Sequence, residues 1–185
     1  MNTPNKITIF RIILVPVFLA VFLLDVPFRF LISAAVFGLA AATDALDGRL
    51  ARKNNLVTVF GQFLDPIADK MLVAAGLLAF MKENLCNIWI VLVILAREFI
   101  ISSLRLIASA QGKVIPANIF GKIKTVMQMV STILVMILCG VNDIVALPFN
   151  ISLLSNILLG ASALMGVISA VIYYNESRNV IDFTK

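Results

Sequence analysis

Four of the ten acidic residues lie close together in a stretch that is otherwise mostly apolar: Asp44, Asp47, Asp65 and Asp69. Asp44 and Asp47 are spaced i, i+3, and Asp65 and Asp69 are spaced i, i+4, so on helices each pair shares one face. The break between the two segments is short, which favours antiparallel neighbouring helices. The pattern therefore predicts four carboxylates that converge near one end of a helix pair.

Four carboxylates this close repel one another unless a positive charge lies among them. Pairing with nearby basic residues explains the cluster poorly. Arg49 points about 170° round its helix from the first aspartate pair, and Lys70 points about 100° from Asp69. Only Arg52 can reach the aspartates, and one positive charge does not balance four negative charges. A bound cation explains the cluster better, and all-oxygen ligands favour Mg²⁺, Mn²⁺ or Ca²⁺.

Two such ions about 3.5–4 Å apart are typical of sites that displace phosphoryl groups. The residues thus predict a site for a phosphate-bearing substrate. Gly48 and Ala51 fall on the same helix face as the first aspartate pair, where small side chains allow either a ligand or a neighbouring helix to approach the backbone. Pro66 is expected in the first turn of its helix, where proline is tolerated.

The elements that position this site follow from composition. Hydrophobic residues make up 61% of the 185 residues and charged residues 14%, against about 45–50% and about 25% in soluble domains. This composition argues against a soluble enzyme and excludes a disordered chain. We predict an all-α polytopic membrane protein, a single domain over residues 1–185 with six transmembrane helices. Their expected ranges are 7–25, 29–53, 62–82, 88–110, 117–140 and 151–175.

Charges between these ranges predict the orientation. Basic residues gather in cytoplasmic loops, and Lys6 and Arg11 near the start and Arg178 and Lys185 near the end place both termini in the cytoplasm. Asp44 then lies about 22 Å along its helix from the outer boundary, at the inner edge of the membrane. The net charge of +5 is thus explained by topology, with no nucleic-acid partner expected.

Other chemistry is limited by the residues present. The chain has no histidine, which removes histidine-based nucleophilic catalysis and histidine-ligated metals. Cys86 and Cys139 are too far apart in the sequence to match a metal motif and are expected to be packing residues.

The aspartates belong to a longer pattern that resembles a known family. Asp44-x-x-Asp47-Gly48-x-x-Ala51-Arg52, eight residues, then Gly61-x-x-x-Asp65-x-x-x-Asp69 is similar to the signature of the CDP-alcohol phosphotransferases. Pro4-Asn5-x-x-Thr8-x-x-Arg11 resembles the N-terminal segment of the phosphatidylglycerophosphate synthase branch. Arg97-Glu98, Arg105 and the segment 121–125 resemble the same branch, so the similarity extends over nearly the whole chain.

The resemblance implies a six-helix, homodimeric enzyme of a bacterial-type cytoplasmic membrane, with its active site facing the cytoplasm. Such enzymes transfer a phosphatidyl group from CDP-diacylglycerol to an alcohol and release CMP. By position, the four aspartates would bind two divalent cations, Mg²⁺ or Mn²⁺, and Asp69 would also be the general base. The remaining signature residues would form the CDP-binding site: Gly48, Ala51, Arg52, Gly61, Asn5 and Thr8.

The acceptor is indicated by an unusual number of charges in apolar segments. One explanation pairs Arg97, Glu98 and Arg105 with charges on other helices and lets Lys122 and Lys124 extend to the interface. The other is a basic pocket for an anionic acceptor. The branch resemblance implies that Arg105 and Lys122, with Arg97 and Lys124, bind the phosphate of glycerol 3-phosphate.

The product would then be phosphatidylglycerophosphate, at the first committed step to phosphatidylglycerol and cardiolipin. Two alternatives use the same chemistry with inositol phosphate or phosphatidylglycerol as acceptor. A third, from another class, is a divalent-cation transporter. The transporter is disfavoured because the acids lie at the membrane edge and no repeat of broken helices is visible.

Overall fold

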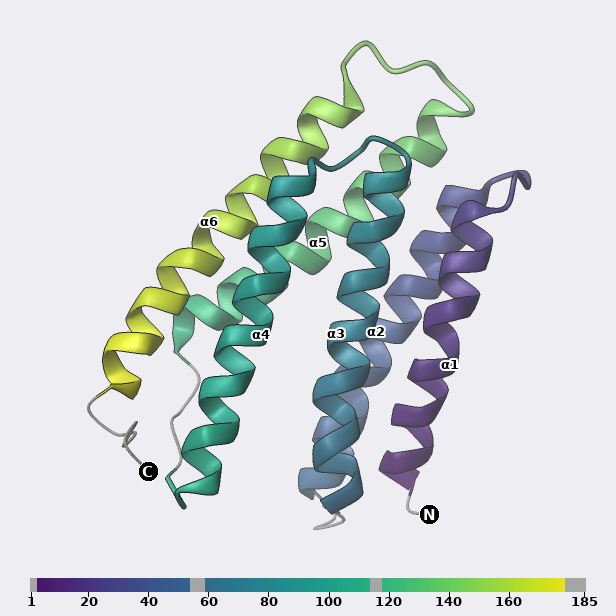
Figure 1. The fold of residues 1–185 in the computed structure, drawn as a ribbon. Helices are drawn as coiled ribbons and strands as arrows, with labels where there is room; N and C mark the ends of the chain where they lie inside the picture. Colours follow the sequence, from purple (N-terminus) through teal and green to yellow (C-terminus); the bar gives the residue numbers. More distant parts are fainter. Residues whose placement is uncertain (1–2, 54–58, 114–117, 179–185) are drawn as a thin grey trace. The chain divides into compact units, whose positions relative to one another are not determined.

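The computed structural model describes residues 3–53, 59–113 and 118–178, with side chains described for 7–43, 64, 66–113 and 118–178. Within the described ranges the chain is all-helical, with six helices and no strand (Figure 1). The helices are α1 (Thr3–Leu23), α2 (Arg29–Lys53), α3 (Val59–Lys82), α4 (Ile88–Ala110), α5 (Ile119–Asn142) and α6 (Ile151–Ser177). The predicted all-α class is confirmed, and every helix lies within a few residues of its expected range.

Local signals explain where α4 begins and ends. The Asn87 side chain caps the start by accepting a hydrogen bond from the Trp89 backbone N–H at 2.9 Å. Gly112 follows the end with a φ of +69°, a left-handed conformation that glycine adopts without strain. The Lys113 N–H then donates to the Ala108 carbonyl at 2.9 Å, so a carbonyl of the last turn is satisfied. These two caps position the charged middle of α4.

The start of α3 differs from the prediction. The helix begins at Val59 rather than at residue 62, so Pro66 lies in its interior and not in its first turn. Proline has no N–H, so the bond that would reach back to the Gln62 carbonyl is absent. The Lys70 ammonium donates to the Pro66 carbonyl at 3.1 Å one turn further on. The expectation failed because neighbouring packing can hold an interior proline that local propensity disfavours.

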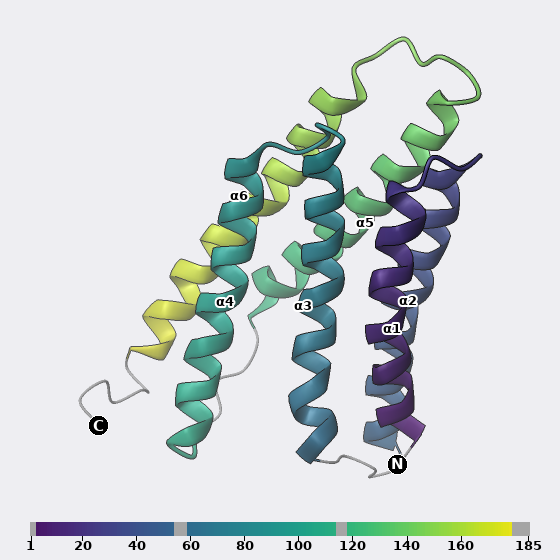
Figure 2. The ribbon, with the colours of Figure 1, turned by 45° about the vertical axis from the view of Figure 1, so that its right-hand side comes forward.

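The contacts divide the chain into two compact units, and the first comprises Met1–Glu83 and Thr132–Ile151. In this unit α1 packs against both α2 and α3, and both views show α1 lying along α2 (Figures 1 and 2). Its core holds a chain of buried aromatic rings with centroids 5.3–5.9 Å apart. These rings are Phe18, Phe22, Phe30, Phe37 and Phe80.

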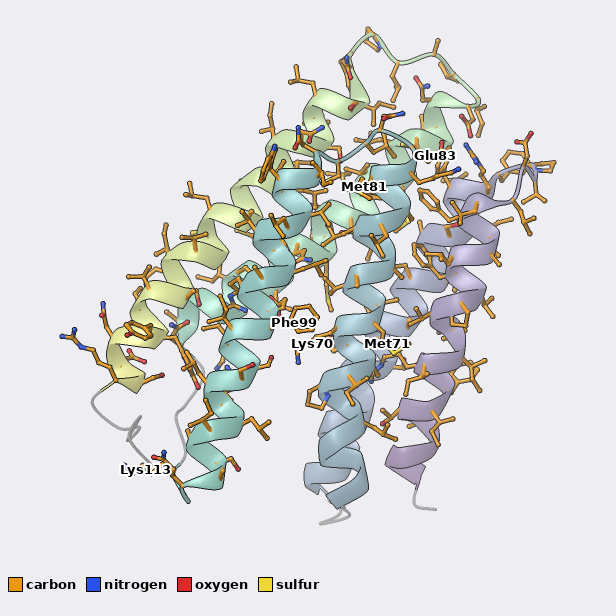
Figure 3. All side chains as sticks on the ribbon, in the orientation of Figure 1. Lys70, Met71, Met81, Glu83, Phe99 and Lys113 are labelled. Atoms are coloured by element: carbon orange, nitrogen blue, oxygen red, sulfur yellow. The ribbon has the colours of Figure 1, made fainter. Side chains whose placement is uncertain are left out.

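Two contacts join the start of α2 to neighbouring segments of the first unit. They lie at the end of α2 that is distant from the aspartates. The Arg29 guanidinium donates to both Glu83 carboxylate oxygens, at 3.1 and 3.4 Å, and so joins the start of α2 to the residue that follows α3. Figure 3 shows Glu83 just after the end of α3 and Lys70 further down α3. A Cβ on Gly140 would lie 2.5 Å from the Leu31 Cγ, so α5 approaches α2 closely at this point. The Arg29–Glu83 pair thus joins the start of α2 to the end of α3, as in an antiparallel helix pair.

The second unit comprises Asn84–Ser131 and Ser152–Lys185, and so contains α4, the first part of α5 and nearly all of α6. Small buried residues of α6, such as Ser162, Ala163 and Gly166, allow close packing. Asn156 links α6 to the chain before α4: its Oδ1 accepts from the Asn87 N–H at 2.7 Å. α4 and α6 thus lie side by side, which the charged cluster described below requires.

Both cysteines are free thiols in the described structure, and both are buried. Cys86 lies in the loop between α3 and α4, where burial raises the pKa of its thiol to about 11. Such a thiol stays protonated and unreactive near neutral pH. The burial agrees with the packing role expected for the two residues.

Large apolar side chains cover much of the outer surface of the helices. Trp89, Leu106, Val126 and Leu164 are all more than 60% exposed, which water disfavours and lipid tolerates. Two described helices, α5 and α6, are long and apolar enough to cross a membrane, and shorter apolar segments occupy residues 7–23 of α1 and 29–43 of α2. The six spans predicted from the sequence remain a prediction.

Candidate functional site

The four aspartates lie on α2 and α3, and the helix bounds give their level. Asp47 and Asp44 lie about 9 and 14 Å before the end of α2 at Lys53, at about 1.5 Å per residue. Asp65 and Asp69 lie about 9 and 15 Å after the start of α3 at Val59. Since α2 and α3 are neighbours connected by a short segment, the two pairs occupy matching levels of adjacent helices.

Of these four side chains, the structure describes only Asp69, which is half-buried on α3. Its neighbour Lys70 is directed to a backbone oxygen of its own helix, the Pro66 carbonyl. Lys70 therefore has a hydrogen-bond partner that is not an aspartate. The sequence-based expectation that Lys70 points away from Asp69 agrees with this contact. The other predicted residues of this region lie outside the described side chains: Asp44, Asp47, Gly48, Ala51, Arg52, Gly61, Asp65 and Asn5.

The donor set fits hard divalent cations. No group of three potential metal ligands occurs among the side chains that the structure describes, and three of the four aspartates are not among them. The helix bounds nevertheless put the two aspartates of each helix at matching levels of α2 and α3. A donor set made only of carboxylates suits Mg²⁺ or Mn²⁺ and is unsuited to soft metals.

The α1 helix contributes two buried polar residues to the first unit. Thr8 is 1% exposed and Arg11 is 0% exposed. Their i, i+3 spacing puts them on one face of the helix that packs against both α2 and α3. Arg11 was counted as an orientation charge for the cytoplasmic side, but the structure buries it in the protein. Its spacing from Thr8 in the N-terminal motif is the signal that could have identified it as a site candidate.

The second unit holds a charged cluster between α4 and α5. The Glu98 carboxylate accepts hydrogen bonds from the Arg97 guanidinium, at 3.0 Å, and from the Lys124 ammonium. Lys124 is only 2% exposed. Two cations share one carboxylate, so the three side chains carry one surplus positive charge in a largely buried position.

Polar groups of α5 and α6 extend this cluster. The Arg97 Nη2 donates to the Ser169 Oγ at 3.0 Å, and the Ser169 Oγ donates to the Asn118 Oδ1 at 3.0 Å. Asn118 also caps α5, since its Oδ1 accepts from the Gly121 N–H at 2.7 Å. We call these six residues the Glu98 network: Arg97, Glu98, Asn118, Gly121, Lys124 and Ser169. The network joins the three helices of the second unit.

The four predicted acceptor-binding cations therefore fall into two pairs. Arg97 and Lys124 belong to the Glu98 network. Glu98 pairs with a charge on another helix, as one explanation expected, but its partner is Lys124, which is buried and does not extend to the interface. Arg105 and Lys122 are exposed. Lys122 and Lys124 differ in this way because two helical residues apart point about 200° from each other. The surplus charge of the network and the two exposed cations together leave α4 and α5 strongly basic.

Comparisons with known proteins decide the family. A family model described as CDP-alcohol phosphatidyltransferase matches residues 1–172. The chain belongs to the CDP-alcohol phosphatidyltransferase family. A Bacillus subtilis (strain 168) protein named CDP-diacylglycerol–glycerol-3-phosphate 3-phosphatidyltransferase is 37% identical over 188 residues, which cover 95% of each chain.

Relatives with the same name occur in other bacteria. The Rickettsia bellii protein is 38% identical over 178 residues, 96% of each chain. The Salmonella typhimurium protein is 43% identical over 135 residues, 70% of this chain and 74% of its own. Family membership and the apolar helices together make this phosphatidyltransferase a membrane protein of phospholipid biosynthesis.

Asn118 and Ser169 were not singled out from the sequence of the phosphatidyltransferase. Each is a single polar residue beside apolar ones, which is common in packed membrane helices. Asn118 carries one available signal: it directly precedes an apolar run and lies three residues before Gly121, the spacing of a helix cap. Nothing in the sequence pairs Ser169 with α4, because that contact spans 72 residues.

The Glu98 network predicts that glycine is preferred at position 121. A Cβ there would lie 3.1 Å from the Asn118 Oδ1, 3.2 Å from the Ser169 Oγ and 3.4 Å from the Arg97 Nη2. Gly121→Ala is therefore expected to destabilise the protein by about 1–3 kcal/mol. The matched control is Gly38→Ala on α2, where a Cβ meets nothing within 4 Å and helix propensity favours alanine by about 1 kcal/mol.

Thermal unfolding in detergent measures both variants of the phosphatidyltransferase. The midpoint should fall for Gly121→Ala and stay constant or rise for Gly38→Ala. Equal shifts in the two variants would contradict the close packing at the start of α5.

Proposed function

We propose that this protein transfers the phosphatidyl group of CDP-diacylglycerol to sn-glycerol 3-phosphate, forming phosphatidylglycerophosphate and CMP. The main support is that Asp47 and Asp65, and likewise Asp44 and Asp69, lie at matching distances along α2 and α3. The names of relatives from Bacillus subtilis and Rickettsia bellii, which align with 95% or more of the chain, support the choice of substrates. The reaction would be the first committed step to phosphatidylglycerol and cardiolipin.

In this proposal the four aspartates hold two divalent cations, Mg²⁺ or Mn²⁺. When bound, such ions neutralise phosphate charge and make a nearby hydroxyl more acidic. Asp69, the half-buried member, takes the proton of the acceptor hydroxyl. The hydroxyl oxygen then forms a bond to the phosphorus that carries diacylglycerol, and the bond from that phosphorus to the bridging oxygen breaks. CMP departs with the electron pair.

The CDP group is assigned to residues near the aspartates. Arg52 can bind the diphosphate by two parallel hydrogen bonds, and Gly48, Ala51 and Gly61 leave the backbone accessible. Asn5 and Thr8 of α1 complete this set, and the burial of Thr8 within the unit that carries the aspartates supports its inclusion. This positioning matters because phosphoryl transfer depends mainly on alignment and charge neutralisation.

The acceptor phosphate is assigned to the basic residues of α4 and α5. Arg105 and Lys122 are exposed and would contact the phosphate. Arg97 and Lys124 would act from within the Glu98 network, whose surplus positive charge attracts an anion. A neutral alcohol acceptor such as serine would need no such charge.

The membrane arrangement in this proposal has six spans, with both termini and the active site on the cytoplasmic side of a bacterial-type cytoplasmic membrane. The positions of Lys6, Arg178 and Lys185 support this orientation. The exposed apolar faces of the helices are available to lipid or to a second copy in a homodimer.

An acceptor panel tests the proposed reaction. Purified protein in lipid nanodiscs receives CDP-diacylglycerol, Mg²⁺ or Mn²⁺, and one acceptor: glycerol 3-phosphate, inositol phosphate or phosphatidylglycerol. CMP release should require glycerol 3-phosphate. CMP release with only one of the other acceptors would support phosphatidyl transfer but show that glycerol 3-phosphate is not the acceptor. Divalent-cation flux into vesicles without any CMP release would favour the transporter.

Removal of Arg105 tests the acceptor assignment. Arg105→Ala should raise the KM for glycerol 3-phosphate about 10–100-fold, since a charge-assisted contact of about 1.5–3 kcal/mol is lost. The KM for CDP-diacylglycerol should change far less. Arg178→Ala, which removes an exposed arginine just after α6, is the matched control. Equal increases in the two KM values would argue against a dedicated acceptor pocket.

A further inference from the structure

Arg105 lies against an aromatic ring of the neighbouring helix. Its guanidinium carbon is 5.5 Å from the centroid of the Tyr173 ring on α6, within the range of a cation–π interaction. Tyr173 is 2% exposed, whereas Arg105 is exposed. The buried ring therefore supports a cation whose charged end reaches the surface of the second unit.

The Tyr173 ring is held firmly. It packs in a cluster with Ile101, Leu104 and Ala108 of α4, and Ala170 packs beside it. Arg105 lies beside this cluster on α4, since it follows Ile101 by four residues and precedes Ala108 by three. A ring fixed among these neighbours gives the Arg105 guanidinium a defined resting position.

The hydroxyl of Tyr173 does not explain why the ring is there. It is buried and has no hydrogen-bond partner among the residues that the structure describes. A buried hydroxyl without a partner lowers stability. The contribution of Tyr173 must come from the packing and the face of its ring.

A ring face supports an arginine differently from a carboxylate. Arg97 already donates to Glu98 and Ser169. In the described part of the second unit, the partner of Arg105 is the ring, which occupies none of the five N–H donors of the guanidinium. Arg105 thus keeps both its full charge and its donors for an anion.

We propose that Tyr173 is a positioning residue that holds Arg105 so that its N–H groups are available to the phosphate of the anionic acceptor. This inference rests on the proposed function, since it presumes that Arg105 binds that phosphate. Tyr173 itself does not contact the acceptor.

Three variants test the role of the ring. Tyr173→Leu removes it, Tyr173→Phe keeps the ring and removes the hydroxyl, and Tyr174→Leu removes the exposed neighbouring ring as a matched control. Tyr173→Leu should raise the KM for glycerol 3-phosphate about three- to tenfold, with kcat and the KM for CDP-diacylglycerol within about twofold of wild type. Tyr173→Phe and Tyr174→Leu should match wild type. A KM raised as much by Tyr173→Phe as by Tyr173→Leu would overturn the role of the ring face.

A double mutant distinguishes positioning of Arg105 by Tyr173 from a purely structural role of Tyr173. In an Arg105→Ala background, Tyr173→Leu should raise the KM for glycerol 3-phosphate no further, because the residue to be positioned is gone. The same further increase in both backgrounds would overturn the inference. If Tyr173→Leu fails to fold, phenylalanine and its mono-, di- and trifluorinated analogues at position 173 keep the shape while weakening the ring face. The KM should then rise with each fluorine, and a constant KM would be the contradicting result.

These outcomes also separate the inference from the proposed function. If wild-type protein releases no CMP with glycerol 3-phosphate, the proposed function fails whatever the Tyr173 variants do. If wild type turns over and Arg105→Ala raises the acceptor KM while Tyr173→Leu does not, only the positioning role is wrong.

Discussion

Asp69→Asn is expected to reduce the rate of CMP release by about 10²–10⁴-fold, the usual contribution of a general base. The substitution keeps the shape of the side chain but removes the negative charge, so it also weakens the predicted divalent-cation site. Binding of CDP-diacylglycerol should be largely retained, because the other three aspartates and the CDP-binding residues are unchanged. Steady-state CMP release and equilibrium binding of the lipid substrate measure the two effects separately.

Asp25→Asn is the matched control for this variant. Asp25 lies in the same unit at the break between α1 and α2, beside Arg29 and Asp143 in a pocket at the end distant from the aspartates. Its substitution should leave turnover unchanged. Normal turnover of Asp69→Asn would show that the general-base assignment is wrong.

Glu98→Gln is expected to have the largest effect on stability. The Glu98 carboxylate pairs with both Arg97 and Lys124. Its replacement by a neutral amide removes the negative charge that these two largely buried cations share. Breaking a buried ion pair from one side costs about 3–5 kcal/mol. At about 2–4 °C per kcal/mol for a chain of this length, the thermal midpoint should fall by about 6–20 °C.

A second substitution separates charge from shape. Adding Lys124→Met to Glu98→Gln removes one of the two cations that Glu98 pairs with, so the double variant should recover part of the lost midpoint. Glu176→Gln, at an exposed position near the end of α6, is the control and should shift the midpoint little. A Glu98→Gln midpoint equal to that of Glu176→Gln would mean that the Glu98 network does not stabilise the fold.

The helices could be predicted because the apolar runs are long and the breaks contain polar or turn-forming residues. Gly112, with its positive φ, ends α4 where the sequence places a break. The start of α3 could not be predicted, because local preference favours proline in the first turn of a helix, whereas Pro66 lies inside α3. Such a preference is a weak guide to where a helix begins.

The positions of the aspartates along α2 and α3 were predictable, whereas their convergence into one site stays a prediction. The i, i+3 and i, i+4 spacings and a short connection are enough to place Asp47 and Asp65 at one level, and the helix bounds agree. The Glu98 network was only partly predictable. The sequence shows the charges on α4 and α5, but the contact between Arg97 and Ser169 depends on packing across 72 residues.

Arg105 illustrates the same limit. Its type and place in an apolar segment identified it as a candidate anion-binding residue. Its support by Tyr173 could not be found from the sequence, because an aromatic residue in an apolar helix is ordinarily a packing residue. The contact becomes visible only when α4 and α6 are placed side by side.

The central claim is that this chain transfers a phosphatidyl group to glycerol 3-phosphate with the help of divalent cations. The most direct test incubates purified protein with CDP-diacylglycerol and radiolabelled glycerol 3-phosphate, with Mn²⁺ or with EDTA, and extracts the lipids. We expect label in the lipid phase, in equal amount to the CMP released, only when Mn²⁺ is present. Label that stays in the aqueous phase, or transfer that persists in EDTA, would contradict it.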